Sequence, residues 1–451
     1  MATAFADRVE SPPAPSASEH DGAGEQAAPP SPAAADAKPA FEFVRETEPL
    51  FDEPFKSLRL AKSAWVLATP SADGEKLGMI SGKARPRYRA HVENEHCKTP
   101  WIEIEPRGFI CVKVRPSKRK PSKASPRRPR PLLGRYGIAR RSAVFYPSLD
   151  DAKNDTKSRK AKGDMIKLIR SVKTDDGRTL WQTQLGEWIT EDKVTVLYGS
   201  QFGGVSLEEP GGLRLPVAFA VNRGSRRARG SVKVFAEPSE TARVAKRLRS
   251  KSVVTPGESS ADGAFVSIGE EMWVRAKDLR IARAVKKPAE ANDGHWIDVD
   301  VDEQVVVAYR GDVPIFATLM SSGTSKDPTP TGVYRVTRKK RETTMLSERD
   351  RPQAYAAAVP WPTYFYEGFA FHSAYWHNSF GTRRSHGCIN LAPKDALRIY
   401  ELLGPELPPG WLSVYGNDVH QPGSVVQIRS SVPVAPPPRP GDEIAASSAS
   451  D

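Results

Sequence analysis

The sequence predicts a mainly β protein, in which three small β-barrel repeats precede a β-rich domain with one main helix, between disordered ends. Apolar residues alternate with polar ones over short stretches, which is the pattern of half-buried strands. A strand that ends in Pro-Ser recurs three times, and both ends are dominated by Ala, Pro and Ser. With 451 residues the chain is long enough for two to four domains, each with its own core.

The N-terminal lead, residues 1–55, and the tail, residues 430–451, contain few residues that could enter a core, so both are predicted to be disordered. No segment approaches the roughly 18 apolar residues that a membrane-spanning helix needs. The start, MATAFADRVES, lacks a charged region followed by an apolar one, which by itself favours a cytoplasmic protein. However, Ala4-Phe5-Ala6 resembles the small-x-small end of a signal peptide whose earlier part is missing, so an exported protein stays open.

The three predicted barrel repeats share an opening and a closing pattern. Each opens with an apolar strand that ends in Pro-Ser (AWVLATPS, AVFYPS and VKVFAEPS). Each closes with an aromatic residue, a short turn and a second strand, beginning at Trp101, Trp181 and Phe265. A simpler reading is that tryptophans such as Trp101, Trp181 and Trp273 only fill small cores. The repeats are expected at residues 56–115, 133–200 and 225–285.

The net charge of +13 comes from one segment, because the twelve Lys and Arg residues between Lys113 and Arg141 have no acid among them and the rest of the chain carries only +1. A linker is therefore expected at residues 116–132, rich in Pro and Ser. It would be either a solvated spacer or a tether to an anionic surface. A bare charge run has no element that reads bases, so specific nucleic-acid binding is not expected.

A further domain is expected at residues 295–429. A hairpin should turn at Arg310-Gly311-Asp312, a strand should follow TPTG, and the aromatic stretch VPWPTYFYEGFAFHSA should add another strand. Pro393 should begin the main helix, whose apolar stripe ends at Leu403, and a last strand should end near Arg429. Residues 338–360 are expected to form a mobile cover, by their length and polarity.

The stretch RRSHGCINLAP in this domain contains Cys388, one of only three cysteines. Three cysteines cannot build a disulfide framework, although a single Cys97–Cys111 pair is possible. A nucleophilic thiol needs an imidazole to accept its proton and positive potential to hold the thiolate. His372, separated from Ser385 by a loop of twelve residues, could supply the imidazole, and the helix that begins near Pro393 could supply the potential.

Two plainer alternatives exist for this stretch. Cys388 could be an inert buried thiol, which is common for free cysteine. It could also join His372, His377 and His386 as a metal ligand, but their spacing fits no common zinc pattern, so no metal is expected. His377 is expected to be only a loop residue.

The arrangement FAFHSAYWHNSFGTRRSHGCIN resembles the signature of L,D-transpeptidases, which is a histidine, a loop and then Ser/Thr-His-Gly-Cys followed by an apolar residue and Asn or Arg. TPTG at Thr329–Gly332, preceded by SSGTSKDP, and the aromatic run before His372 also resemble that family. The loop between the histidine and the motif is shorter here than is usual in the family. The resemblance covers residues 295–429, and the three repeats resemble bacterial Src-homology-3-like barrels, which usually bind peptide or wall fragments.

The resemblance implies a role for each residue of the motif. Cys388 would be the nucleophile and His372 the general base and acid, with Ser373 orienting the imidazole through its carbonyl. The amide of Gly387, with that of Cys388, would stabilise the oxyanion. The expected substrate-binding residues are Ser385, His386 and Asn390.

The resemblance also implies a reaction and a location. The enzyme would release D-Ala from a peptidoglycan stem tetrapeptide, form a thioester on Cys388 and pass the acyl group to an acceptor amine, or to water. No cofactor is implied, and the protein would act in the periplasm or cell wall. The expected partners are peptidoglycan stem peptides, with anionic wall polymers as a further possibility for the 113–141 basic run. The alternative is a wall-binding protein whose transpeptidase domain is degenerate.

Overall fold

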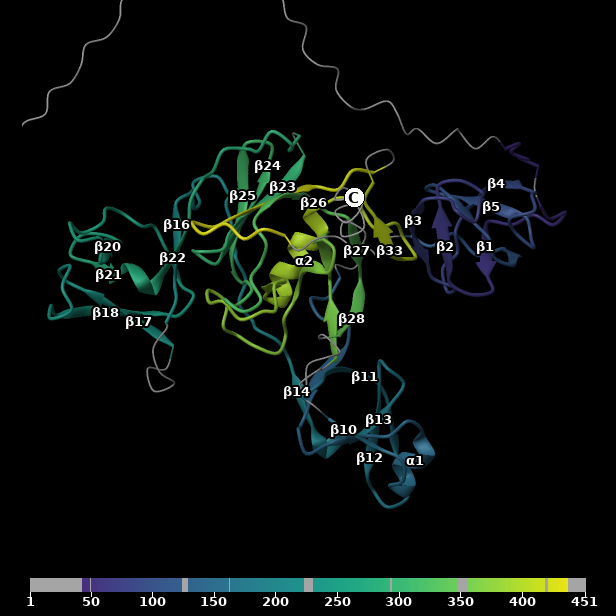
Figure 1. The fold of residues 1–451 in the computed structure, drawn as a ribbon, viewed down its shortest axis with the longest axis horizontal. Coiled ribbons are helices and arrows are strands. Elements are labelled where there is room, and N and C mark those ends of the chain that lie inside the picture. Colours follow the sequence, from purple (N-terminus) through teal and green to yellow (C-terminus); the bar gives the residue numbers. More distant parts are fainter. Residues whose placement is uncertain are drawn as a thin grey trace, which may run out of the picture. The chain divides into compact units, whose positions relative to one another are not determined.

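The computed structural model describes residues 43–48, 50–123, 129–161, 163–222, 230–292, 294–346, 356–417 and 421–436. Within these residues the chain is mainly β with two α-helices, which confirms the predicted fold class (Figure 1). No helix among them is long and apolar enough to cross a membrane. Most of the predicted disordered lead and tail lies outside the described residues.

The first β-unit, residues 43–123, has a core built around Leu58, Val66 and Ile104. Cys97 and Cys111 form a disulfide inside it. Strands β1 and β7 pair antiparallel with Ser57 opposite Ser117, and the other five strands form a second ladder. The strands are β1 (Ser57–Leu60), β2 (Ala64–Leu67), β3 (Lys76–Ile80), β4 (Tyr88–Val92), β5 (Trp101–Ile104), β6 (Phe109–Ile110) and β7 (Val114–Ser117).

The start of the predicted basic linker belongs to this unit. Ser117 lies in β7, and the backbone amide of Ser122 donates to the carbonyl of Arg85 over 2.8 Å. The hydroxyl of Ser57 also donates to the carbonyl of Arg119 over 2.7 Å. The expectation of a free spacer from residue 116 was therefore wrong for residues 116–122, because these backbone groups find partners in the β-unit.

The second β-unit, residues 129–200, contains the first helix, α1 (Leu149–Asn154). The second Pro-Ser pair ends a strand and begins this helix, since the side chain of Ser148 accepts a hydrogen bond from the amide of Asp151 as an N-cap. The other elements are β8 (Arg135–Ala139), β9 (Val144–Phe145), β10 (Arg159–Lys160), β11 (Met165–Lys173), β12 (Thr179–Thr183), β13 (Trp188–Thr190), the 3-10 helix η1 (Glu191–Lys193) and β14 (Val194–Leu197).

The third β-unit, residues 217–282, has two small antiparallel sheets that share a core around Val234 and Val274. Its elements are β16 (Val217–Ala220), β17 (Ser231–Phe235), β18 (Val244–Arg249), β19 (Val253–Val254), β20 (Phe265–Ser267), β21 (Trp273–Arg275), the 3-10 helix η3 (Ala276–Asp278) and β22 (Leu279–Ala282). The Src-homology-3-like character of the three units stays a prediction.

The C-terminal domain begins with β23 (His295–Asp300). The predicted hairpin follows: β24 (Val305–Arg310) pairs antiparallel with β25 (Val313–Ser321), and the turn lies at Gly311. Short β15 (Val205–Ser206) adds to the edge of β25. The remaining elements are β26 (Gly332–Arg335), β27 (Arg338–Lys340), β28 (Glu342–Leu346), β29 (Ala356–Pro360), β30 (Thr363–Tyr366), β31 (Phe369–Ser373), β32 (Ile389–Leu391), α2 (Pro393–Leu402), β33 (Trp411–Tyr415) and β34 (Val425–Arg429).

Two expectations for this domain were wrong. The aromatic stretch forms the end of β29 and all of β30 and β31 instead of one strand. The backbone turns at Trp361 (φ 61°), between β29 and β30, and at Glu367 (φ 40°), between β30 and β31. The described parts of 338–360 form β27, β28 and β29, with β28 and β29 paired antiparallel and β29 also paired with β11. Length and polarity predicted a mobile cover there, whereas the described backbone is held in ladders; residues 347–355 lie outside the described part of the chain.

Helix α2 begins at Pro393, as predicted, and packs on β31 and β32. Its stripe of Ala396, Leu397, Ile399 and Tyr400 is buried with Phe371 and Ile389 in one core. This packing covers one face of the β31–β32 pair and leaves the other face to the site described next.

Candidate active site

The β31–β32 ladder brings the predicted base and nucleophile to one face of the sheet. The strands are parallel, with Phe371 opposite Ile389 and His372 opposite Asn390. Because side chains alternate along a strand, Phe371 and Ile389 point into the core under α2, while His372 and Asn390 point the other way. Cys388 directly precedes β32, two residues before Asn390, so it shares their face. Strand spacing and rise place its Cα about 8 Å from that of His372.

The same face carries two residues that the sequence did not single out. In the β27–β30 ladder Arg338 lies opposite Tyr364, and in the β30–β31 ladder Tyr364 lies opposite Ala370, the neighbour of Cys388 across the sheet. Small Ala370 leaves room between Tyr364 and the thiol. Burial raises the pKa of Tyr364, the guanidinium of Arg338 opposes this rise, and the charge of the Cys388 thiolate adds to it.

Arg338 stacks over the ring of Tyr364, with its guanidinium carbon 4.1 Å from the ring centroid. Its Nε is buried and has no hydrogen-bond partner among the described residues. The site therefore holds a cation whose hydrogen-bonding capacity is not used up by the protein around it. The turn at Glu367-Gly368 was the signal that could have placed Tyr364 beside Ala370 in advance.

His372 is buried, and its Nδ1 lies 3.2 Å from the carbonyl oxygen of Ser373. A carbonyl only accepts, so Nδ1 carries the proton and Nε2 of the neutral ring is left as an acceptor. Burial lowers the pKa of His372 to about 4, and the Ser373 carbonyl only partly opposes this. The imidazole is therefore neutral near pH 7 and able to accept a proton.

Cys388 is half-buried, and its Sγ lies 3.7 Å from the carbonyl oxygen of Gly368. Burial raises the pKa of its thiol to about 11, although the backbone of Ala370 opposes the rise. His372 and Cys388 are both described, and no hydrogen bond joins them. The resting pair is thus a neutral thiol and a neutral imidazole.

Helix α2 does not lie at Cys388, contrary to expectation. Strand β32 intervenes, so the first turn of the helix lies beyond the far end of this strand, on the order of 15 Å along the chain from Cys388. A helix dipole falls off within about one turn, so it cannot favour the thiolate here. The first turn instead holds the carboxyl of Asp395, which bonds to Thr318 Oγ1 (2.5 Å) and to the amide of Gly204 (2.9 Å).

The turn before Cys388 is fixed by two hydroxyls. Ser385 Oγ donates to the carbonyl of Cys388 and accepts from the amide of Gly387 over 3.2 Å. Thr329 Oγ1, from TPTG, donates to the carbonyl of Gly387 over 2.7 Å and accepts from the amide of Gly323 over 2.9 Å. The Gly387 amide, expected as an oxyanion donor, is therefore already occupied by Ser385 in this structure.

Gly387 is required at its position by conformation and by space. Its φ is +100°, and a Cβ there would lie 2.4 Å from the ring of Phe369. His386, expected to shape the substrate pocket, is exposed on the same turn.

Asn390, also expected in the pocket, lies within hydrogen-bonding distance of His377, which was predicted to be only a loop residue. Its Nδ2 lies 3.2 Å from Nε2 of buried His377, whose Nδ1 accepts from the amide of Ser379. Nε2 of neutral His377 must then carry the proton, so two donors would face each other. Reversing the amide lets Asn390 Oδ1, otherwise unpartnered among the described residues, accept this bond. The NH₂ group of Asn390 is then free to donate on the other side.

The loop between His372 and Ser385 is held by the preceding β-units. Lys251 Nζ donates to the carbonyl of Asn378 over 2.7 Å, and Ser200 Oγ lies 2.5 Å from the side-chain oxygen of Asn378. Buried Arg280 donates to the carbonyl of Gly381 over 2.9 Å. The shortened loop is thus anchored at two points by residues outside the C-terminal domain. The described residues contain no group of three or more His, Cys, Asp or Glu that could hold a metal ion.

Comparison with known proteins finds a similarity in the part of the chain that contains this site. Residues 294–428 match the family profile described as YkuD, L,D-transpeptidase catalytic domain. YciB of Bacillus subtilis (strain 168), provisionally named an L,D-transpeptidase, is 32% identical over 120 residues, which are 24% of this chain. The chain spans 59% of the length of that relative.

Solved L,D-transpeptidases give only weak global similarity. The enzyme from Stackebrandtia nassauensis is 25% identical over 32% of this chain and 58% of its own, with a TM-score of 0.24. The E. faecium catalytic domain is 22% identical over 31% of this chain and 98% of its own (TM-score 0.25). L,D-transpeptidase 3 from Mycobacterium tuberculosis, solved with a faropenem-derived adduct, is 19% identical over 51% of this chain and 99% of its own, with a TM-score of 0.25. TM-scores this low carry no argument, so the similarity of this chain to L,D-transpeptidases rests on the family profile that matches residues 294–428.

Proposed function

We propose that the protein is a cell-wall L,D-transpeptidase with Cys388 as its nucleophile. The sulfur attacks the carbonyl carbon that joins the third residue of a peptidoglycan stem tetrapeptide to D-Ala, while Nε2 of His372 accepts the thiol proton. The same imidazole returns this proton to the leaving amine, so D-Ala departs and a thioester remains. An acceptor amine then attacks the thioester to give a cross-link, or water attacks it to give carboxypeptidase activity.

One observation carries this proposal: the parallel β31–β32 register, which sets Cys388 and His372 on the sheet face opposite α2. The bond from His372 Nδ1 to the carbonyl of Ser373 supports the proton-accepting tautomer and the orienting role of Ser373. Because the Gly387 amide is occupied, we assign the oxyanion to the Cys388 amide and the NH₂ group of Asn390. Ser385 holds the turn, and exposed His386 is assigned to substrate binding.

Arg338 extends the proposed site towards the substrate. Stem peptides carry free carboxylates, and a guanidinium is suited to pair with a carboxylate. Arg338 lies in the cross-strand row of Tyr364, Ala370 and Cys388 and has a buried Nε without a partner among the described residues. We therefore propose that it binds a carboxylate of the donor peptide near the thiol.

The proposed location is outside the cytoplasm, in the periplasm or wall. Disulfides persist in oxidising compartments, and the Cys97–Cys111 bond is of this kind. The proposed partners are peptidoglycan stem peptides, with no cofactor.

A second candidate function is wall binding by a protein whose transpeptidase domain is inert. The raised pKa of the Cys388 thiol and the missing hydrogen bond to His372 favour it. Incubation with a carbapenem followed by intact-mass measurement separates the two, because L,D-transpeptidases are typically acylated at this cysteine. We expect a single adduct, absent from Cys388→Ala and slowed in His372→Gln. A folded protein without any adduct would support the inert domain.

A further inference from the structure

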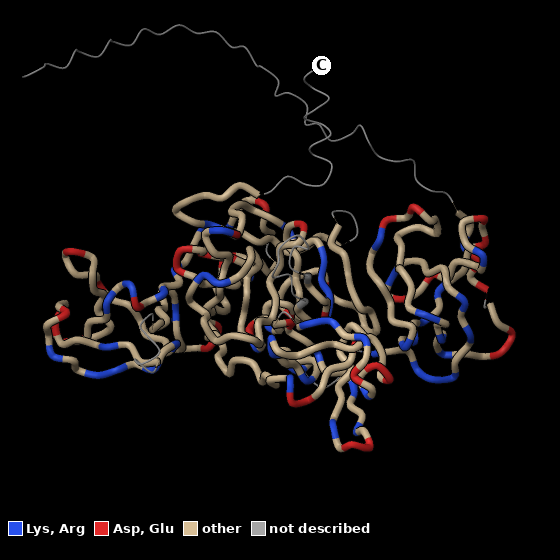
Figure 2. Tube along the Cα trace, turned by 60° about the horizontal axis from the view of Figure 1, so that its bottom comes forward, with Lys and Arg blue, Asp and Glu red and all other residues tan. Residues whose placement is uncertain are grey.

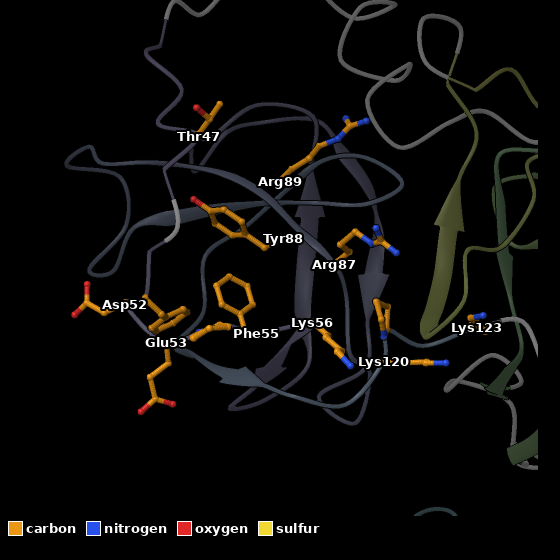
Figure 3. A pocket seen from close by; sticks show the side chains of 13 residues that line it. Thr47, Asp52, Glu53, Phe55, Lys56, Arg87, Tyr88, Arg89, Lys120 and Lys123 are labelled. Atoms are coloured by element: carbon orange, nitrogen blue, oxygen red, sulfur yellow. The ribbon is translucent and has the colours of Figure 1, made fainter.

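The first β-unit contains a cavity that the proposed catalysis does not use. Its volume is about 860 Å³, within the range of about 300–1,000 Å³ typical of ligand sites. We call it the basic cavity and define it by Phe51, Phe55, Lys56, Arg87, Tyr88 and Lys120. Figure 3 shows Lys56, Arg87 and Lys120 gathered on one side, Phe55 and Tyr88 in the middle, and Asp52 and Glu53 on the other side.

Three distant parts of the chain bring the cations together. Lys56 directly precedes β1, and its amide donates to the carbonyl of Ser117 at the end of β7 over 2.9 Å. Lys120 follows three residues later, where its carbonyl accepts from Nε of Arg85 over 3.1 Å. Arg87 directly precedes β4. The start of the basic run is therefore a fixed wall of this cavity.

The charges on this wall are not neutralised by the protein. Arg87 pairs with exposed Glu105 over 3.2 Å, whereas Lys56 and Lys120 have no ion-pair partner among the described residues. The whole unit has seventeen Lys and Arg residues against ten Asp and Glu, a net charge of +7, and Figure 2 shows many blue positions on it. A ligand that places anionic groups against this wall would gain charge-assisted hydrogen bonds.

The middle of the basic cavity is apolar and rigid. The rings of Phe51 and Phe55 meet at 90° with centroids 5.6 Å apart, and those of Phe55 and Tyr88 meet at 75° over 5.8 Å. The hydroxyl of Tyr88 donates to the carbonyl of Glu48 over 2.8 Å, which fixes its ring. Half-buried rings of this kind offer flat apolar surface beside polar groups, as the C–H face of a sugar ring requires.

We propose that the basic cavity binds an anionic glycan, a short sugar chain that carries carboxylate or phosphate groups. The sugar rings would pack on Phe55 and Tyr88, and the anionic groups would pair with Lys56 and Lys120. Single-stranded nucleic acid fits less well, because edge-to-face rings give no platform for a run of stacked bases. The disulfide in the same unit also indicates an oxidising compartment, where nucleic acid is not the usual partner.

The test is calorimetric titration of the full chain with four probes: tetragalacturonate, phosphopentamannose, neutral chitotetraose and a twelve-residue oligouridylate. We expect at least one anionic glycan to bind tenfold or more tightly than the neutral glycan and the RNA, and the better one identifies the anionic group. Lys56→Gln/Lys120→Gln should weaken that binding at least tenfold. The matched control Lys62→Gln/Lys83→Gln removes the same charge from exposed positions outside the cavity and should change it less than twofold.

Equal losses in the two double variants would overturn the proposal, because binding would then follow the diffuse charge of the unit. Binding of the RNA as tight as that of the glycan, or no binding of either anionic glycan, would overturn it as well. Phe55→Leu separates the aromatic contribution: it should weaken glycan binding about fivefold and leave binding of tripolyphosphate unchanged. Thermal unfolding followed by circular dichroism serves as the control for folding in every variant.

Discussion

Thr329 is the residue through which the TPTG motif fixes the nucleophile turn, and Thr329→Val is the most informative substitution. The side chain is 2% exposed, and its hydroxyl bonds to the carbonyl of Gly387 and the amide of Gly323. Valine has the same shape but leaves both backbone groups buried without partners, at about 1–3 kcal/mol each. We expect the free energy of unfolding to fall by about 2–6 kcal/mol, the sum of the two costs.

The same substitution should slow acylation of Cys388, because the freed turn no longer holds the thiol in place. Misplacement of reacting atoms by about 1 Å costs on the order of 100-fold in rate, so we expect a fall of about 10- to 100-fold. The assay is the rate of carbapenem adduct formation, measured together with urea unfolding. Thr329→Ser keeps the hydroxyl and should retain most of the unfolding free energy and most of the acylation rate. If the valine variant kept the wild-type stability and acylation rate, Thr329 would not be what fixes the turn before Cys388.

Three further predictions concern the surroundings of the thiol. Arg338→Gln should raise the KM for a donor peptide with a free carboxylate about tenfold and leave the KM for an amidated donor unchanged. An equal rise of the KM for both donors would contradict a contact between Arg338 and the carboxylate. Burial lowers the pKa of His372 to about 4 from 6.5, so the unfolded chain binds more protons between these values. Stability should fall by about 3 kcal/mol as the pH drops through this range. The free energy of unfolding, measured by urea titration at several pH values, should change less steeply with pH in His372→Gln than in the wild type. Equal pH dependence in the two proteins would contradict a buried neutral ring at His372. Lys251→Gln removes the hydrogen bond to Asn378 and should slow acylation of Cys388 about tenfold, whereas Lys246→Gln on exposed β18 should not. Similar acylation rates in the two variants would show that Lys251 does not hold the loop in its active position.

Local patterns predicted much of the C-terminal domain. Alternation and the Arg310-Gly311-Asp312 turn predicted the β24–β25 hairpin, and Pro393 with its apolar stripe predicted α2. These features depend on residues close in sequence, which is why the sequence alone could predict them.

The features that the sequence did not predict depend on pairing between distant segments. Strand β32 has only three residues, too few to show alternation, so Cys388 was expected beside the helix instead of at the far end of a strand. The place of Arg338 follows from two successive ladders, and the fixed start of the basic run follows from the β1–β7 ladder. Charge and proline content predicted a spacer at residues that the first β-unit holds with backbone bonds.

The anchoring of the short loop also needed the three-dimensional structure. The sequence showed only that this loop is shorter than is usual in L,D-transpeptidases, whereas the structure shows that Lys251, Ser200 and Arg280 hold it from the preceding β-units. Their effect on chemistry is a matter of position, because none of them lies in the row of residues beside the thiol.

Whether Cys388 is the nucleophile of an L,D-transpeptidase is tested most directly by turnover of a peptidoglycan stem tetrapeptide by the purified full chain, followed by mass spectrometry. We expect release of D-Ala with a cross-linked or tripeptide product, a thioester whose mass maps to the peptide that contains Cys388, and loss of both in Cys388→Ser. Release of D-Ala that persists in Cys388→Ser, or no release by a folded protein that carbapenems do acylate, would contradict it.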